Sequence, residues 1–148
     1  MKILAFIIPF VFVLSSNAFD KCFTIAGEKY KIQPEILLSI AIVESSLNPG
    51  SVNVNKNKTK DIGLMQINSI WLPKLREYNI NEKKLQEPCQ NIIIGAWILS
   101  QCINKFGYTW KAIDCYNKGP SKAKNYSKYT LKVYKEIQRL KKLNKKKN

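Results

Sequence analysis

The chain has 148 residues, of which 45% are hydrophobic, and it carries a formal net charge of +15 without any histidine. This length and composition predict one globular domain with a buried core. The lack of histidine and of a CxxC pair, and the wide spacing of the four cysteines, argue against a metal site, and no pattern indicates a cofactor.

The first eighteen residues have the layout of a secretory signal peptide. Lys2 supplies a short positive region, an apolar run extends from Ile3 to Leu14, and Ser16-Asn17-Ala18 places small residues at a cleavage site. An N-terminal membrane anchor is the alternative, but the apolar run is shorter than the ~20 residues that a spanning helix needs. We therefore expect cleavage after Ala18 and export, and no other segment predicts a membrane span.

Export gives the four cysteines a structural role, because disulfides are the default in an oxidising compartment. Four cysteines allow three pairings. We favour Cys22–Cys89, which ties the start of the mature chain to its middle, and Cys102–Cys115, which would join the two arms of a helical hairpin. Two buried free thiols are the alternative for the second pair.

Helix signals are frequent along the chain and strand signals are weak, which predicts a small all-α domain. Pro34 fits the first turn of a helix that ends before Asn48-Pro49-Gly50. Gly107 fits the end of one helix, and Thr109 fits the cap of the next. The expected helices are 22–30, 34–47, 61–68, 69–78, 90–106, 110–117 and 127–140, with an exposed loop at 51–60 and a short turn from 81 or 82 to 87.

Positive charge is concentrated near the end of the chain. Residues 19–117 contain twelve basic and nine acidic residues, a net of +3, whereas residues 118–148 contain twelve basic and one acidic residue, a net of +11. Such a segment attracts anionic surfaces and polymers. A lysine-rich composition from an AT-rich genome is the alternative. The apolar stripe of helix 127–140 predicts docking on the core, and the lysine-rich run 141–148 predicts a disordered tail.

A single acidic residue, Glu44, follows the apolar run from Ile36 to Val43. At helical spacing it continues the buried line through Leu37 and Ile40, with no basic residue nearby in sequence. Desolvation favours the protonated carboxyl group and raises its pKa, which is what a general acid needs at neutral pH. The alternative is a glutamate that turns outward at the last turn and is solvated.

Two further segments carry polar side chains of the kind that bind sugars. In 61–68, Gly63 permits a close backbone approach, and Gln66 and Asn68 are amides inside an apolar stretch. Near the end of helix 110–117, Tyr116 and Asn117 offer a hydroxyl and an amide. Taken separately, each segment is also compatible with core packing or helix capping.

The order of these segments resembles the lytic transglycosylase family. An apolar helix ends in Glu44-Ser45-Ser46, Gly63-Leu64-Met65-Gln66-Ile67-Asn68 follows, and Tyr116-Asn117-Lys118-Gly119 comes near the end. The nearest resemblance is to the small, single-domain transglycosylases of bacterial type III and type IV secretion systems and pili. Segments 20–23, 71–75, 88–89 and 95–99 fit that subgroup too, so the resemblance spans about residues 22–119.

The resemblance implies a lysozyme-like fold of the goose-type lysozyme and transglycosylase class and cleavage of the β-1,4 bond between N-acetylmuramic acid and N-acetylglucosamine. We expect this single domain to cover residues 19–126, followed by the basic helix and tail at 127–148. We also expect a monomer in the periplasm or cell envelope of a bacterium. Its partners would be peptidoglycan strands and secretion or pilus components. Glu44 would be the catalytic acid and base. The implied substrate-binding residues are Ser45, Met65, Gln66, Asn68, Tyr116 and Asn117.

Two positions depart from the family pattern. Cys115 replaces a small residue, often alanine, which supports a local disulfide. Lys118 also replaces a small residue, and from the cleft rim it could contact an anionic peptide or lactyl carboxylate.

One enzyme carboxyl group suffices for a lytic transglycosylase, in which the substrate supplies its own nucleophile. Asp61 is the one motif-adjacent candidate for a second carboxylate, and we expect it to cap its own helix. A hydrolytic lysozyme is the first alternative, and a non-catalytic, cationic wall-binding or membrane-active protein is the second. Export and the lack of aromatic interleaving beyond three tyrosines argue against nucleic acid as a partner.

Overall fold

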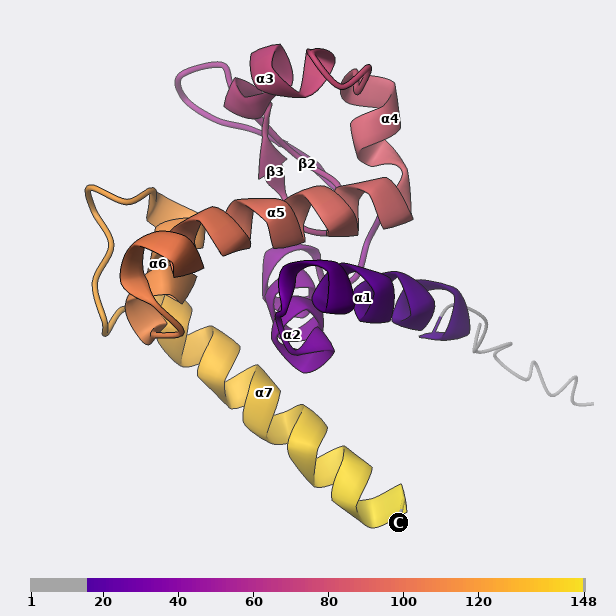
Figure 1. The fold of residues 1–148 in the computed structure, drawn as a ribbon, viewed down its shortest axis with the longest axis vertical. Helices are drawn as coiled ribbons and strands as arrows, with labels where there is room; N and C mark the ends of the chain where they lie inside the picture. Colours follow the sequence, from indigo (N-terminus) through magenta and orange to yellow (C-terminus); the bar gives the residue numbers. More distant parts are fainter. Residues whose placement is uncertain (1–15, 148) are drawn as a thin grey trace, which may run out of the picture.

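The computed structural model describes residues 16–147, so residues 1–15 of the predicted signal peptide lie outside the described part of the chain. The described chain is predominantly helical, as predicted, with one small sheet (Figure 1). The helices are α1 Ser16–Tyr30, α2 Pro34–Ser45, α3 Leu72–Arg76, α4 Glu82–Gln86, α5 Pro88–Phe106, α6 Trp110–Lys118 and α7 Lys128–Lys147. The other elements are strands β1 Val52–Val54, β2 Lys60–Ile62 and β3 Ile67–Asn68 and the 3-10 helix η1 Ser69–Trp71.

Helix α5 crosses the middle of the molecule, and the core forms around it (Figure 1). Helices α1 and α2 lie on one side of α5, and the sheet with α3 and α4 lies on the other. Ile92 and Leu99 of α5 belong to the same buried apolar cluster as Leu37 and Ile40 of α2. Each such side chain contributes roughly 1.5–3 kcal/mol by leaving water, so this cluster fixes α2 within the core.

The predicted helix at 61–68 is wrong, and the predicted loop at 51–60 is partly a hairpin. Strands β1, β2 and β3 form an antiparallel sheet in that order, with Asp61 opposite Asn68. The backbone turns between β2 and β3 because Gly63 and Gln66 have positive φ values of 77° and 49°. Left-handed backbone at two positions this close is incompatible with a continuous right-handed helix.

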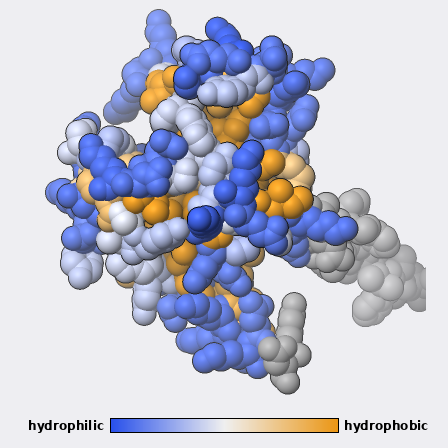
Figure 2. Space-filling model, in the orientation of Figure 1, coloured by the Kyte–Doolittle hydropathy of each residue, from blue (hydrophilic) through white to orange (hydrophobic). Residues whose placement is uncertain are grey.

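Helix α7 continues to Lys147, where the sequence predicted a disordered tail from residue 141. Its inner face includes Val133, which is fully buried, and Ile137, which packs on the core. Leucine, lysine and arginine are good helix formers, so the helix extends beyond its docked part. The free end projects from the domain in Figure 1, and hydrophilic side chains cover it in Figure 2.

Both favoured disulfides are present, which confirms the predicted pairing. Cys22–Cys89 joins α1 to α5, and Cys102–Cys115 joins α5 to α6. The second bridge fixes the hairpin that carries Tyr116, and Thr109 caps α6 as predicted by accepting a hydrogen bond from the Ala112 N–H. Among residues 16–147, no helix combines the length and apolar character needed to cross a bilayer.

Candidate active site

Glu44 lies in the last turn of α2, at the point where that helix meets the sheet. Ser46 ends the helix with a positive φ of 53°, and its N–H donates to the Ile42 carbonyl. The Ser45 hydroxyl donates to the Leu64 carbonyl at 2.8 Å. This bond ties the end of α2 to the turn between β2 and β3. Ser45 therefore positions the neighbouring Glu44, and its hydroxyl is occupied by the backbone.

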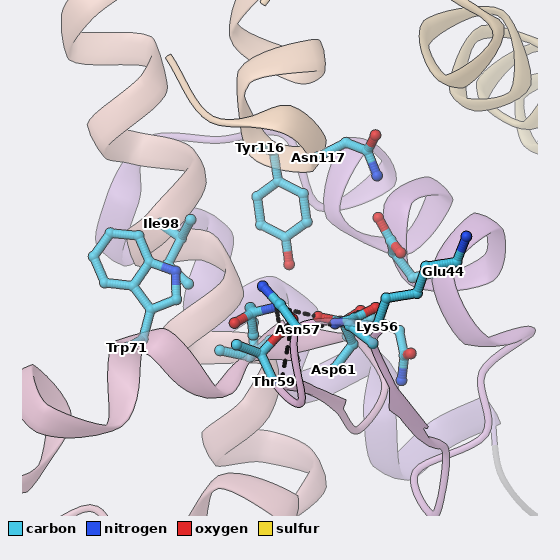
Figure 3. Close-up of a pocket in the computed structure, with 13 residues that line it drawn as sticks. Glu44, Lys56, Asn57, Thr59, Asp61, Trp71, Ile98, Tyr116 and Asn117 are labelled. Atoms are coloured by element: carbon cyan, nitrogen blue, oxygen red, sulfur yellow. Dashed lines mark hydrogen bonds between the residues drawn. The ribbon is translucent and has the colours of Figure 1, made fainter. Parts of the chain in front are cut away.

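A cleft of about 490 Å³ opens beside Glu44 (Figure 3). In this view Tyr116 enters from α6 and points toward Asp61 and Thr59 on the sheet side, while Trp71 and Ile98 form an apolar wall. Five amide side chains also line the cleft, and they are Asn55, Asn57, Gln66, Asn68 and Asn117. Amides and hydroxyls both donate and accept hydrogen bonds, so this lining matches a neutral, polyhydroxylated ligand such as a sugar chain.

The Glu44 carboxyl group has the protonation behaviour of a general acid. Burial raises its pKa from the ordinary value of 4.5 to about 7, and the negative charge of Asp61 raises it as well. A hydrogen bond from Tyr129 and the positive charge of Lys132 act in the opposite direction. Since desolvation dominates, the group exchanges a proton near neutral pH, where acid–base catalysis is most efficient.

Tyr129 on α7 is a site residue that the sequence analysis missed. Its hydroxyl donates to Oε1 of Glu44 at 2.7 Å, across a sequence separation of 85 residues. In the sequence it belongs to the apolar stripe of the last helix, which predicts only packing. The docking of α7 against α2 brings it to the carboxyl group, and no local pattern could have indicated that contact.

Replacing Tyr129 by phenylalanine should alter the pH dependence of any activity that needs Glu44. The hydroxyl stabilises the carboxylate, so its loss should raise the pKa of Glu44 further and move the alkaline limb of the pH–rate profile to higher pH. The maximal rate should fall by about threefold to tenfold, because the carboxyl group loses an orienting hydrogen bond.

The control for this substitution is Tyr134→Phe on the same helix, since Tyr134 is exposed and its ring makes an edge-to-face contact with Trp110. Superimposable pH–rate profiles for wild type and Tyr129→Phe would show that the hydrogen bond does not tune Glu44.

Tyr116 is held in the cleft by the backbone of the motif turn. Its hydroxyl donates to the Met65 carbonyl at 2.6 Å, and burial raises its pKa well above the usual value, as do the charges of Glu44 and Asp61. It therefore stays neutral. The Met65 side chain is fully buried and faces Gly95 of α5. The predicted substrate contact of Met65 is thus corrected to a packing role, with its carbonyl anchoring Tyr116.

Gln66 and Asn68 both line the cleft, but protein groups occupy much of their hydrogen-bonding capacity. The Gln66 amide nitrogen donates to the Gly63 carbonyl at 2.9 Å, and its oxygen accepts from Asn53 at 2.6 Å. The Asn68 amide nitrogen donates to Asp61 at 2.8 Å, and its oxygen accepts from the Ile70 N–H. Because these hydrogen bonds fix the orientation of both amide groups, their remaining donors and acceptors face a ligand in a defined direction.

Asp61 does not cap a helix, because it lies in β2. Its two carboxylate oxygens accept hydrogen bonds from Asn55 at 2.9 Å and from Asn68 at 2.8 Å. The hairpin thereby brings a second carboxylate into the cleft with Glu44. Within residues 16–147, no group of three histidine, cysteine, aspartate or glutamate side chains is placed to hold a metal ion.

Asn117 and Lys118 are the last two residues of α6. Asn117 is exposed and lines the cleft. Lys118 does not line this cleft, and its ammonium group pairs with Asp114 at 3.1 Å. The asparagines of the 51–60 segment and Trp71 were not predicted as site residues. An asparagine-rich loop beside a turn motif was the only sequence signal for these asparagines, whereas Trp71 opens segment 71–75, which fits the resembled subgroup.

Comparison with known proteins gives a consistent set of relatives. Residues 21–138 match the family model described as Transglycosylase SLT domain. Invasion protein IagB of Salmonella typhimurium is 37% identical over 140 residues, covering 92% of this chain and 88% of that protein. Protein IpgF of Shigella flexneri is 38% identical over 122 residues, covering 80% of each.

The fold also matches a solved structure. An inactive mutant of lytic transglycosylase Slt from Pseudomonas aeruginosa superposes with a TM-score of 0.60 at 21% identity, over 79% of this chain. This chain spans 20% of that much longer protein, so the likeness concerns the fold of one domain.

Proposed function

Because the chain belongs to the Transglycosylase SLT domain family, we propose that it is a peptidoglycan lytic transglycosylase with Glu44 as its catalytic acid and base. The substrate is the β-1,4 bond between N-acetylmuramic acid and N-acetylglucosamine. The observation that carries the proposal is a carboxyl group with a pKa of about 7 in a cleft lined by five amides.

In the proposed reaction, protonated Glu44 donates its proton to the glycosidic oxygen, and the bond from C1 of muramic acid to that oxygen breaks. The substrate's 2-acetamido group stabilises the positive charge that develops at C1. Glu44, now a carboxylate, accepts the proton of the C6 hydroxyl of the same sugar, whose oxygen bonds to C1. The products are a 1,6-anhydro end and a free 4-hydroxyl, and Glu44 regains its proton.

The rest of the cleft positions the glycan for this step. Amide edges of Gln66, Asn68 and Asn117 bind hydroxyl and N-acetyl groups, and Trp71 offers an apolar surface to a sugar ring. Tyr129 orients the carboxyl group through its hydrogen bond. Because protein groups already fix several of these side chains, the cleft is preorganised, which lowers the entropic cost of reaching a reactive geometry.

Hydrolysis by a lysozyme mechanism is the second candidate, and the presence of Asp61 in the cleft is the observation that favours it. A retaining hydrolase needs a second carboxylate ~5–5.5 Å from the acid. Product analysis separates the two functions. Digestion of purified peptidoglycan should release fragments with 1,6-anhydromuramic ends, detected by mass spectrometry. Reducing ends in their place would overturn the transglycosylase proposal and favour the lysozyme.

The substitution Asp61→Asn tests the role of the second carboxylate directly. Its charge raises the pKa of Glu44, so removing it should move the alkaline limb of the pH–rate profile to lower pH and leave anhydro products unchanged. Asp20→Asn on the exposed face of α1 is the matched control. A nucleophile would behave differently, since its loss should remove activity by about a thousandfold or more at every pH.

The proposed cellular role is local opening of the cell wall for a secretion apparatus or pilus, after export to the periplasm or envelope. Two disulfides are typical of an oxidising compartment, and the similar protein IagB is named an invasion protein. Cell fractionation with N-terminal sequencing tests the export step. A mature periplasmic protein should begin at Phe19, and a cytoplasmic protein that retains Met1 would contradict it.

A further inference from the structure

A second hollow, of about 590 Å³, lies on the other side of Glu44. It shares two wall residues, Glu44 and Asn117, with the amide-lined cleft. Its chemistry differs, because four lysines line it and no acidic residue other than Glu44 does. The lysines are Lys118 from α6, Lys124 from the connecting segment, and Lys128 and Lys132 from the first turns of α7.

The segment that carries these lysines is held in place by one buried carboxylate. Asp114 is fully buried, and it accepts hydrogen bonds from the Ser127 hydroxyl at 2.6 Å and the Lys124 N–H at 2.8 Å. Burial alone would raise the pKa of Asp114, but these bonds and the ion pair with Lys118 hold it below its usual value. These bonds hold the segment between α6 and α7 against α6, so the positions of the lysines around the hollow are fixed.

The positive charge in the hollow is only partly compensated. Lys118 has Asp114 as its partner, and the charge of Lys132 acts on Glu44. Within residues 16–147, however, Lys124, Lys128 and Lys132 form no ion pair. Like charges gathered in one concave surface repel each other, and an anionic ligand would relieve that repulsion. The ligand must lie close to the reacting sugar, because the hollow and the cleft meet at Glu44.

We propose that this hollow binds the carboxylate groups of the peptide that the muramic acid carries next to the scissile bond. The inference rests on the proposed function and extends it to the peptide part of the substrate. Muramic acid bears its peptide through a lactyl ether, and this peptide carries several free carboxylates along its length. Because the hollow shares Glu44 and Asn117 with the amide-lined cleft, a substituent of a sugar whose C1 lies at Glu44 has a short path to the lysines.

The position of the hollow favours the substrate's peptide over a separate anionic polymer or a lipid surface. An anionic wall polymer or a membrane would be attracted by any exposed lysine, including those along the projecting end of α7. The four lysines of the hollow instead form a wall that is continuous with the catalytic cleft. Binding here would therefore select glycan that still carries its peptides.

The test compares glycan strands with intact peptides and the same strands stripped by an amidase. Because the amidase frees a carboxylate on each lactyl group, that carboxylate is converted to a primary amide before digestion. Both substrates are then digested by wild type and by the double variant Lys124→Gln/Lys128→Gln. The variant should lose about fivefold to tenfold in kcat/KM on peptide-bearing strands and little on stripped strands. The control is Lys141→Gln/Lys142→Gln, which removes the same charge farther along α7, and it should leave both values unchanged.

Binding to the variant Glu44→Gln provides a readout that does not depend on turnover. Calorimetry should show tighter binding of a soluble disaccharide-peptide than of the disaccharide whose lactyl carboxylate is amidated, and the Lys124→Gln/Lys128→Gln change should abolish that difference. Equal losses on both substrates, or no preference for the peptide, would overturn the inference. A wild-type protein that cleaves neither substrate would overturn the proposed function, which is a different result.

Discussion

Glu44→Gln should reduce the rate of peptidoglycan cleavage by at least about a thousandfold, the upper part of the range for removal of a general acid. Glutamine has the same shape and can still accept the hydrogen bond from Tyr129, but it cannot donate a proton to the glycosidic oxygen. The mechanism needs this one group twice, first as acid and then as base, so no residual route through the enzyme remains. Clearing of cell-wall suspensions and anhydro product release are the measurements.

The same substitution should stabilise the fold at alkaline pH. The pKa of Glu44 in the folded protein, about 7, lies above its ordinary value of 4.5. Its stabilising contribution is therefore fully present below pH 4.5 and is lost as the pH rises through about 7. Glutamine never ionises, so Glu44→Gln should melt at a higher temperature than wild type above that pH, and the difference should shrink in acid.

The matched control is Glu35→Gln, the other glutamate of α2, which lies in the first turn of that helix. It should leave the rate of peptidoglycan cleavage unchanged. If Glu44→Gln cleared cell walls as well as wild type does, the enzyme proposal would fail. The cationic, non-catalytic protein would then be the better account of this chain.

Local chemistry explains why most helices and the Cys102–Cys115 disulfide were predictable. Pro34 begins α2, Thr109 caps α6, and Gly107 ends α5 where a glycine was expected to do so. These signals act within one turn of the chain. The helical hairpin that they define also brought Cys102 and Cys115 to similar heights. The family resemblance predicted the site residues, because it assigned Glu44 and Tyr116 to the same site without knowledge of any contact between them.

Contacts between distant segments explain what was missed. The turn after β2 needs left-handed backbone at Gln66, which a propensity argument assigns to glycine or asparagine. The surrounding fold holds this glutamine there, partly through Asn91 of α5. In the same way, Tyr129 reaches Glu44 only because α7 docks on α2. In both cases the contact joins segments that are far apart in the sequence, so the sequence around one residue does not indicate the other.

Asn91→Ala should therefore lower the free energy of unfolding by about 3–5 kcal/mol, because it removes three hydrogen bonds between a fully buried side chain and the backbone. The fully buried Asn91 amide donates to the carbonyls of Ile62 at 2.8 Å and Leu85 at 2.9 Å. Its oxygen accepts from the Met65 N–H at 2.7 Å. Thermal unfolding should show a fall in Tm of about 10–20 °C.

Asn104→Ala is the control, since Asn104 is exposed on the same helix and the substitution is identical. At a temperature where both variants are folded, Asn91→Ala should also cleave peptidoglycan more slowly. The loosened turn carries the carbonyl that anchors Tyr116 and the carbonyl that anchors Ser45, next to Glu44. One buried amide would then support both the fold and the geometry of the acid. Equal stability of the two variants would show instead that water or a rearranged backbone satisfies these groups without Asn91.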